Sequence, residues 1–198
     1  MTIKVGIVAI QGAVSEHVET VERTLQSLGL KGSAVQVRRP PDLEGVHALI
    51  LPGGESTTIA KLLVKFGLFD RIIARANEGM PIMGTCAGTI LLAKEGDDQV
   101  SKTETKLLGL MDMAVDRNAF GRQRESFEAD LTIEGLKTPF HAVFIRAPAI
   151  TRVWGKCKAL SRFEDKIMVA RQGNLLALAF HPELTKDLRL HSLLLQMI

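Results

Sequence analysis

Apolar residues recur in two different rhythms along the first half of the chain. Residues 3–10 form an almost continuous apolar run, which is typical of a strand in a parallel sheet covered on both faces. Residues 14–28 instead carry apolar side chains every three or four positions and are followed by Gly29, which predicts an amphipathic helix that ends there. The same criteria predict strands at 34–37 and 46–51, helices at 58–66 and 69–77, and a strand that leads into Cys86.

This alternation predicts an α/β fold with three layers and a mostly parallel, doubly wound sheet. The second half is richer in strands, with short pieces expected at 112–116, 126–133, 140–145, 152–163 and 166–180 and a final helix at 186–197. Neither a linker nor an internal repeat separates the halves. We therefore expect residues 1–198 to form a single domain in which the later strands extend one sheet.

The composition favours a compact intracellular enzyme. The 198 residues are 46% hydrophobic and 24% charged, which allows a sizeable core. The net charge of +3 forms no basic block, which argues against nucleic acid as a partner, and no apolar run is long enough to span a membrane. Two cysteines make no disulfide framework and no signal peptide is visible, so the cytoplasm is the expected location. The five histidines lack metal-ligand spacing, so neither a metal nor another cofactor is expected.

The segment Pro-Ile-Met-Gly-Thr-Cys-Ala-Gly at 81–88 carries the strongest chemical signal. Its Gly-x-Cys-x-Gly pattern predicts a sharp turn from strand to helix with Cys86 at the apex, a nucleophile elbow with sulfur in place of oxygen. Small neighbours let the strand and the helix approach closely, and a helix N-terminus favours the thiolate. A buried core cysteine is the alternative, so the hypothesis needs a base elsewhere in the chain.

The best candidate base follows another apolar run near the other end of the chain, in His181-Pro182-Glu183. Because Pro182 restricts the backbone, we expect the side chains of His181 and Glu183 to lie on the same side of an extended chain. Cys86 as nucleophile, His181 as general base and Glu183 as the carboxylate that orients the imidazole form the arrangement of acyl-transfer enzymes. The alternative is a histidine that merely ends a strand.

The loop after the third predicted strand contains paired glycines, Gly53 and Gly54. Glycine leaves backbone N–H groups free to face a developing oxyanion, and the N–H of Ala87 is the natural second donor. The alternative is an ordinary β-turn in which Ser56 or Thr57 caps the next helix, and both can hold together.

Two polar segments later in the chain place an arginine near a predicted strand end. Arg117 and Arg146 can each bind the carboxylate of an amino-acid substrate through a bidentate fork, or anchor a structural salt bridge. The sequence leaves these alternatives open.

With these motifs the sequence resembles the class I, triad-type glutamine amidotransferases. More narrowly, it is similar to the glutaminase subunits of pyridoxal 5′-phosphate synthase. The matching motifs occur in the family's order and span residue 5 to about 191. Beside the elbow they are 11–17, 53–58, 117–123 with 126–128, 144–148, 172–174 and 180–185.

The resemblance implies a flavodoxin-like glutaminase that hydrolyses L-glutamine to glutamate and ammonia through a glutamyl thioester on Cys86. It implies an oxyanion hole formed by Gly53, Gly54 and Ala87. It also implies a substrate site whose members come from three loops: Gly54, Glu55, Ser56, Arg117, Ile145 and Arg146.

The resemblance further implies a hetero-oligomer with a synthase (lyase) subunit, similar in architecture to a (β/α)8 barrel, which uses the ammonia to make the vitamin B6 cofactor. We expect Gln11, Glu16 and His17, which follow the first strand, to belong to the docking face. The alternative for Glu16 and His17 is a solvated helix start. Since glycine permits reorientation, we expect docking to turn a peptide of the Gly53-Gly54 loop and complete the oxyanion hole.

Two rival functions remain. A cysteine hydrolase of the DJ-1/PfpI-like group would share the elbow but would not need His181-Pro182-Glu183 or the 53–56 loop. A non-catalytic regulatory subunit would keep the fold and bind the synthase without turning over glutamine, and the intact triad argues against it.

Overall fold

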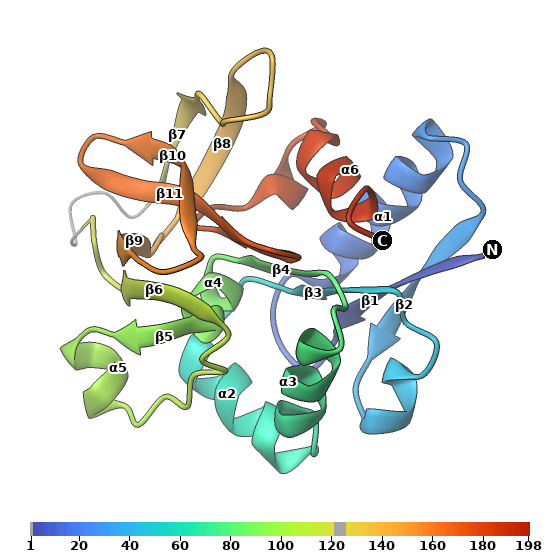
Figure 1. Cartoon of the computed structure of the whole chain (residues 1–198), viewed down its shortest axis with the longest axis horizontal. Helices are drawn as coiled ribbons and strands as arrows, with labels where there is room; N and C mark the ends of the chain where they lie inside the picture. Colours follow the sequence, from blue (N-terminus) through green and yellow to red (C-terminus); the bar gives the residue numbers. More distant parts are fainter. Residues whose placement is uncertain (1, 121–125) are drawn as a thin grey trace.

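The computed structural model describes residues 2–120 and 126–198, and within them ten strands form one mixed sheet (Figure 1). These strands are β1 (Ile3–Val8), β2 (Gly32–Val37), β3 (Ala48–Leu51), β4 (Ile82–Thr85), β5 (Ala93–Gly96), β6 (Met111–Asp116), β9 (Ala149–Val153), β10 (Lys158–Phe163), β11 (Lys166–Gln172) and β12 (Leu175–Leu178). Their order is β2-β1-β3-β4-β12-β11-β9-β6-β5, and β10 pairs with β11. The strands from β2 to β12 are parallel neighbours, whereas β11 pairs antiparallel with β9, β10 and β12.

Helices cover both faces of the sheet, as the three-layer prediction requires. They are α1 (Val14–Ser27), α2 (Ser56–Lys65), α3 (Phe69–Asn77), α4 (Ala87–Leu92), α5 (Asp98–Lys102) and α6 (Arg189–Leu195), with short 3-10 turns η1 (Pro40–Leu43) and η2 (Pro182–Leu184). The core divides at the sheet. In β3, Leu49 and Leu51 pack with α2, α3 and α4, whereas Ile50 packs with α1 and α6 (Figure 1). The α/β prediction is confirmed.

Three predictions about the second half are wrong in detail. The pair β7 (Ser126–Leu131) and β8 (Phe140–Ile145) forms a separate two-stranded sheet, so the later strands do not all extend one sheet. The predicted strand at 152–163 is interrupted by a turn after β9. The predicted strand at 166–180 is the β11–β12 hairpin, which reverses at Gly173, where φ is 57°. Residues 93–102, which received no prediction, form β5 and α5.

The strand order gathers the motifs predicted to be reactive. Because parallel neighbours end at the same edge of a sheet, the segments that follow β1, β3, β4 and β12 lie side by side. Thr85 at the end of β4 pairs with Leu178 at the end of β12, which places Cys86 beside the chain that continues to His181.

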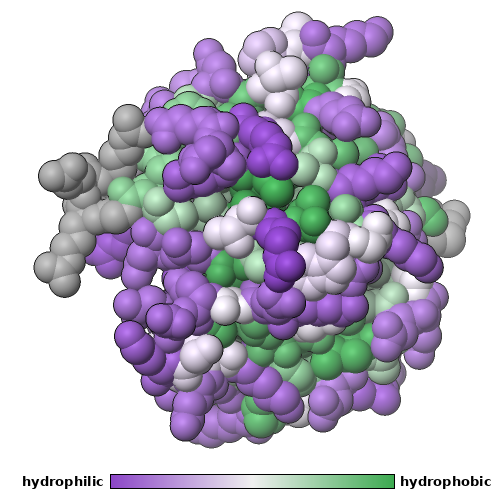
Figure 2. Space-filling model, turned by 60° about the vertical axis from the view of Figure 1, so that its left-hand side comes forward, coloured by the Kyte–Doolittle hydropathy of each residue, from purple (hydrophilic) through white to green (hydrophobic). Residues whose placement is uncertain are grey.

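One face of the molecule is mostly polar (Figure 2). Figure 2 shows a face on which hydrophilic side chains dominate and hydrophobic ones show in patches between them. Within the described residues, none of the helices has the length and apolar character needed to cross a membrane.

Candidate active site

Cys86 stands at a strained turn between β4 and α4. Its φ of 48° and ψ of −106° lie outside the ordinary regions for a residue with a side chain, as a nucleophile elbow requires. A side chain on Gly84 would collide with the backbone of Gly88, and one on Gly88 would collide with the Leu51 carbonyl. The two glycines therefore allow the close packing of strand and helix, as the sequence predicted.

The elbow is fastened to β12 by hydrogen bonds. The backbone N–H of Cys86 donates to the Leu178 carbonyl at 2.8 Å, and the buried Thr89 hydroxyl donates to the same oxygen at 2.6 Å. These contacts fix the position of the thiol relative to the strand that leads to His181.

His181 and Glu183 form a buried pair at the end of β12. His181 Nδ1 lies 2.7 Å from Glu183 Oε1, and both residues are buried. The prediction that the two side chains share one side is confirmed, but its reason is wrong, because Pro182 begins the 3-10 turn η2 rather than an extended segment. The backbone N–H of His181 donates to Val143 at 2.9 Å, which ties the turn to β8.

The surroundings of Gly53 place the side chains of Cys86 and His181 next to each other. A side chain on Gly53 would collide with His181 Cε1 and come within 3.3 Å of Cys86 Cβ. Burial lowers the pKa of His181, but hydrogen bonds to Cys86 and Glu183 and their charges outweigh it and raise the pKa to about 10. His181 is therefore an imidazolium at neutral pH, ready to donate a proton before it acts as a base.

A cavity of about 320 Å³ opens beside Cys86. Its lining is Gly54, Glu55, Ser56, Cys86, Ala87, Ile90, Arg117, Asn118, Arg146 and Pro148. Five of the six predicted substrate-binding residues are among them, whereas Ile145, Gly53, His181 and Glu183 are not. The Ser56 hydroxyl is buried in this wall and makes no hydrogen bond within the described part of the chain. Sequence reasoning missed Ile90, Asn118 and Pro148. The last two lie in motifs that it had selected, whereas Ile90 carried no signal.

Glu55 and Arg117, which both line the cavity, form an ion pair. Arg117 Nη2 donates to Glu55 Oε1 at 2.9 Å, and Arg117 Nη1 donates to the hydroxyls of Thr57 and Thr103 at 3.1 Å. Glu55 also caps α2 by accepting from the N–H groups of Thr57 and Thr58, so the cap predicted for Ser56 or Thr57 belongs to Glu55. Burial raises the pKa of Glu55, but hydrogen bonds from Thr58 and Thr57 and the charge of Arg117 lower it to about 2.

Ile145 and Arg146 approach the thiol from β8. The Ile145 carbonyl oxygen lies 3.9 Å from Cys86 Sγ. Arg146 has a φ of 44°, a strained value for a non-glycine residue, and it is exposed at the rim of the cavity. Two strained residues thus face one cavity.

The docking prediction is wrong for His17. This residue is fully buried, as a tightly packed part of α1, and so has no surface to offer a partner; the solvated alternative is also wrong for it. Glu16 is exposed, and its carboxylate accepts from Ser15 at 3.0 Å. Gln11 is half-buried, and its side-chain oxygen accepts from the Glu55 N–H at 2.9 Å. Gln11 therefore contacts the loop that lines the cavity.

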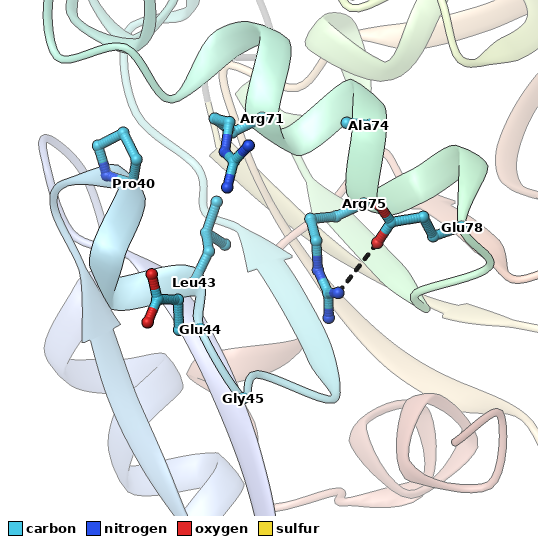
Figure 3. A pocket seen from close by; sticks show the side chains of 8 residues that line it. All are labelled: Pro40, Leu43, Glu44, Gly45, Arg71, Ala74, Arg75 and Glu78. Atoms are coloured by element: carbon cyan, nitrogen blue, oxygen red, sulfur yellow. Dashed lines mark hydrogen bonds and ion pairs between the residues drawn. The ribbon is translucent and has the colours of Figure 1, made fainter.

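A second cavity, of about 290 Å³, lies between η1 and α3 (Figure 3). Arg71 and Arg75 of α3 project beside it, and Glu44 lies across from them. Arg75 is already engaged, since it donates to Glu78 at 3.0 Å and to the Val46 carbonyl at 2.8 Å. None of the residues lining this cavity is a nucleophile or an imidazole, so it offers no group of the kind that the cavity beside Cys86 contains.

The remaining candidate groups add no second reactive centre. Burial raises the pKa of the other cysteine, Cys157, to about 11, which keeps that thiol protonated. Across residues 2–120 and 126–198 no cluster of three or more His, Cys, Asp and Glu side chains is arranged to hold a metal ion. The end of the 117–123 motif, from residue 121, lies outside the described residues.

The sequence matches known proteins over nearly its whole length. The model of the SNO glutamine amidotransferase family matches residues 7–198. Pyridoxal 5′-phosphate synthase subunit PdxT of Archaeoglobus fulgidus is 55% identical over 98% of both chains. The subunit of the same name from Methanosarcina barkeri is 51% identical, again over 98% of both chains.

Solved structures agree with this match. A crystal structure of a glutamine amidotransferase superposes with a TM-score of 0.86 at 48% identity, over 98% of this chain and 97% of that one. The structure of PurLQS from Thermotoga maritima has a TM-score of 0.65 at 17% identity over 99% of each chain, a likeness of fold alone.

Proposed function

Because this chain belongs to the SNO glutamine amidotransferase family, we propose that it hydrolyses L-glutamine to glutamate and ammonia and supplies the ammonia to pyridoxal 5′-phosphate synthesis. The observation that carries the proposal is the meeting of Cys86, at a strained elbow, with a buried His181–Glu183 pair. A thiol, an imidazole and a carboxylate in this order are the machinery of acyl transfer.

The protonation of His181 sets the order of the steps. The Cys86 thiolate attacks the side-chain carbonyl carbon of glutamine, and the His181 imidazolium gives its proton to the nitrogen, which leaves as ammonia. The resulting glutamyl thioester is attacked by water, whose proton returns to the now neutral His181. Collapse of the second tetrahedral intermediate releases glutamate and restores the thiolate. Glu183 stabilises the imidazolium at the start and the end of the cycle.

The cavity suits a zwitterionic amino acid. Gly54, Glu55, Ser56, Arg117 and Arg146 line it, and the Ile145 carbonyl oxygen lies 3.9 Å from the thiol. We assign the carboxylates and guanidinium groups to the charged end of glutamine, and the unpartnered Ser56 hydroxyl to one of its polar atoms.

The oxyanion hole is assigned to the N–H groups of Gly53 or Gly54 and of Ala87. In the free chain the Gly53 carbonyl accepts from the Ala13 N–H at 3.1 Å, which fixes the orientation of the Gly53–Gly54 peptide. Turning that peptide requires this bond to break. The start of α1 is therefore the part of the chain through which docking would act on the loop.

Relatives of this chain bear the name of a synthase subunit, and we propose that this chain also works in a hetero-oligomer with a synthase subunit. The exposed Glu16 and the half-buried Gln11 belong to the proposed docking face. We further propose that the chain acts as a single domain in the cytoplasm, where a reducing environment keeps its two free cysteines reduced.

The test is ammonia release from L-glutamine by the purified chain, alone and with a matching synthase subunit. We expect strong stimulation by the partner and complete loss of release in Cys86→Ala, while Cys157→Ser behaves as the unchanged chain. Complex formation without ammonia release in either condition would sink the catalytic assignment and favour a regulatory subunit.

A further inference from the structure

Two buried histidines lie behind the proposed triad. His17, in the first turn of α1, and His191, in α6, are both buried, and His17 Nδ1 lies 3.1 Å from His191 Nε2. On its other side His17 Nε2 lies 3.1 Å from the Thr85 hydroxyl and 3.4 Å from Glu183 Oε2. His17 therefore connects α6 both to the triad carboxylate and to the residue before Cys86.

Both histidines are neutral. Burial lowers the pKa of His17 well below its usual value, and the nearby His191 and His181 lower it further. Burial lowers the pKa of His191 to about 3. A neutral imidazole has one N–H donor and one acceptor nitrogen, so in each ring either Nδ1 or Nε2 carries the proton.

The surroundings select one tautomer for both rings. His17 Nε2 is hydrogen-bonded to the Thr85 hydroxyl, which can accept or donate, and it lies 3.4 Å from Glu183 Oε2, which is buried and makes no hydrogen bond within the described residues. A proton on His17 Nε2 is favoured, because a bare lone pair there would face the carboxylate. His17 Nδ1 is then an acceptor and receives the Nε2–H of His191. His191 Nδ1, which has no partner in the described structure, is left as a lone pair rather than as a stranded N–H. The opposite choice would strand a buried donor and place two acceptors face to face.

We propose that His17 is a positioning residue for Glu183, in a chain of N–H groups in which His191 donates to His17 and the Nε2–H of His17 faces the carboxylate of Glu183. The Nε2–H of His17 faces the second carboxylate oxygen at 3.4 Å, a charge contact, while His181 Nδ1 lies 2.7 Å from the first. The carboxylate is thereby held in the orientation that faces His181. This role rests on the proposed function, because it serves the same triad.

Helix α1 and the residues just before it also contact two parts of the site, the loop of Gly53 and Glu55 and the triad. Gln11 and Ala13, just before α1, bond the loop of Gly53 and Glu55, and His17 in its first turn contacts Glu183. The titratable groups that face His17 are Glu183 from η2, His191 from α6 and, beyond Glu183, His181. A displacement of the start of α1 would therefore act on the loop and on the triad together.

The tautomers can be observed without any activity assay. In the full chain labelled with ¹⁵N-histidine, NMR chemical shifts distinguish protonated from bare ring nitrogens. We expect His17 and His191 both to carry the proton on Nε2 at neutral pH. A His17 that is protonated on Nδ1, or charged, overturns the proposal.

Matched substitutions test the positioning role. The side-chain nitrogen of glutamine can take the place of Nε2 of histidine, whereas asparagine reaches only the position of Nδ1. We expect His17→Asn to lower kcat for ammonia release, measured with the synthase partner, by roughly ten- to a hundredfold with little change in KM, because a donor to a charged group is lost. His17→Gln should restore most of kcat, and His141→Asn, at an exposed histidine, should change nothing.

The pKa of His181, followed by the same NMR experiment, gives a second readout. It should fall in His17→Asn and return towards the unchanged value in His17→Gln. Equal losses in the two folded variants, or an unchanged pKa and kcat in His17→Asn, would show that His17 only fills space. If the His17 variants do not fold, His191→Gln and His191→Asn make the same comparison for the donor from His191 to His17. Absence of glutaminase activity in the unsubstituted complex would refute the proposed function. The tautomers and the pKa of His181 would still show whether His17 positions Glu183.

Discussion

Two groups of side chains near Cys86, here called the buried wall and the open wall, hold their charges in different ways. The buried wall lies outside the lining of the cavity and consists of His181, Glu183, His17 and His191, and the Glu183 side chain is 0% exposed. The open wall consists of Glu55, Arg117 and Arg146, and the Glu55 side chain is 48% exposed. Both walls contain an ion pair or its equivalent at a similar distance, 2.7 Å in one and 2.9 Å in the other.

This difference in burial separates the two tasks of the site. In the buried wall, water does not compete for the hydrogen bond between Glu183 and His181, so the electrostatic interaction of the carboxylate with the imidazole is not weakened by solvent. The geometry of this pair is fixed before substrate binds. In the open wall the ion pair competes with water, so its charges can be shared with a ligand at little cost. The buried wall should therefore control the chemical step, and the open wall the affinity for glutamine.

The largest effect is expected in the buried wall, for Glu183→Gln. A neutral amide cannot stabilise the His181 imidazolium, so the pKa of His181 should fall from about 10 and kcat should drop by roughly 10²- to 10⁴-fold, as for carboxylates of other triads. The measurement is kcat for ammonia release as a function of pH in the complex, with the exposed Glu19→Gln as matched control. The alkaline limb of the profile should move to lower pH. A profile with an unchanged alkaline limb would contradict the assignment of Glu183.

An intermediate effect, of another kind, is expected in the open wall for Arg117→Lys. Lysine keeps the charge but cannot reproduce the fork that reaches Glu55, Thr57 and Thr103 together. We expect KM for glutamine to rise by roughly tenfold, the worth of one charge-assisted hydrogen bond, with kcat nearly unchanged. Steady-state kinetics separate the two constants, and Arg152→Lys, in the exposed pair with Glu95, serves as control. A fall in kcat at constant KM would mean that the two walls are not independent.

The sequence was sufficient to predict the parts of the site whose residues lie close together along the chain. The glycines around Cys86 determine the elbow within five residues, and the motif of His181 and Glu183 contains both partners two residues apart. The topology that brings these motifs together followed from the alternation of strands and helices, because parallel strands end at one edge.

What the sequence could not provide is burial of polar groups by tertiary packing. The apolar stripe of α1 predicted Leu28 as part of the buried face, but Leu28 is exposed, and the buried face instead includes His17, Thr20 and Thr24. The two threonine hydroxyls donate to carbonyls one turn earlier, which satisfies them inside the protein. Hydrophobic periodicity assigns such residues to the solvent, which agrees with the alternative of a solvated helix start for His17 but not with its burial.

The edge strand β5 was missed for a related reason. Its residues Ala93-Lys94-Glu95-Gly96 are mostly exposed and charged, since a strand at the edge of a sheet is protected from pairing with other chains by such side chains. The sequence pattern of a buried strand is absent there, and only the pairing with β6 reveals the strand.

The smallest effect concerns stability, and it tests how little the ionised Glu55 of the open wall contributes to the free energy of unfolding. The pKa of Glu55 in the folded chain, about 2, lies below the value of about 4.3 for an unperturbed glutamate. Ionised Glu55 therefore contributes stability above about pH 4.3, and this contribution is lost as the pH falls through about 2. Glu55→Gln should lower the free energy of unfolding at pH 6 by about 1 kcal/mol or less, the worth of a helix cap. Denaturant unfolding from pH 6 to pH 2 should show the two chains converging at the acid end, and a difference that grows on acidification would contradict the ionised cap.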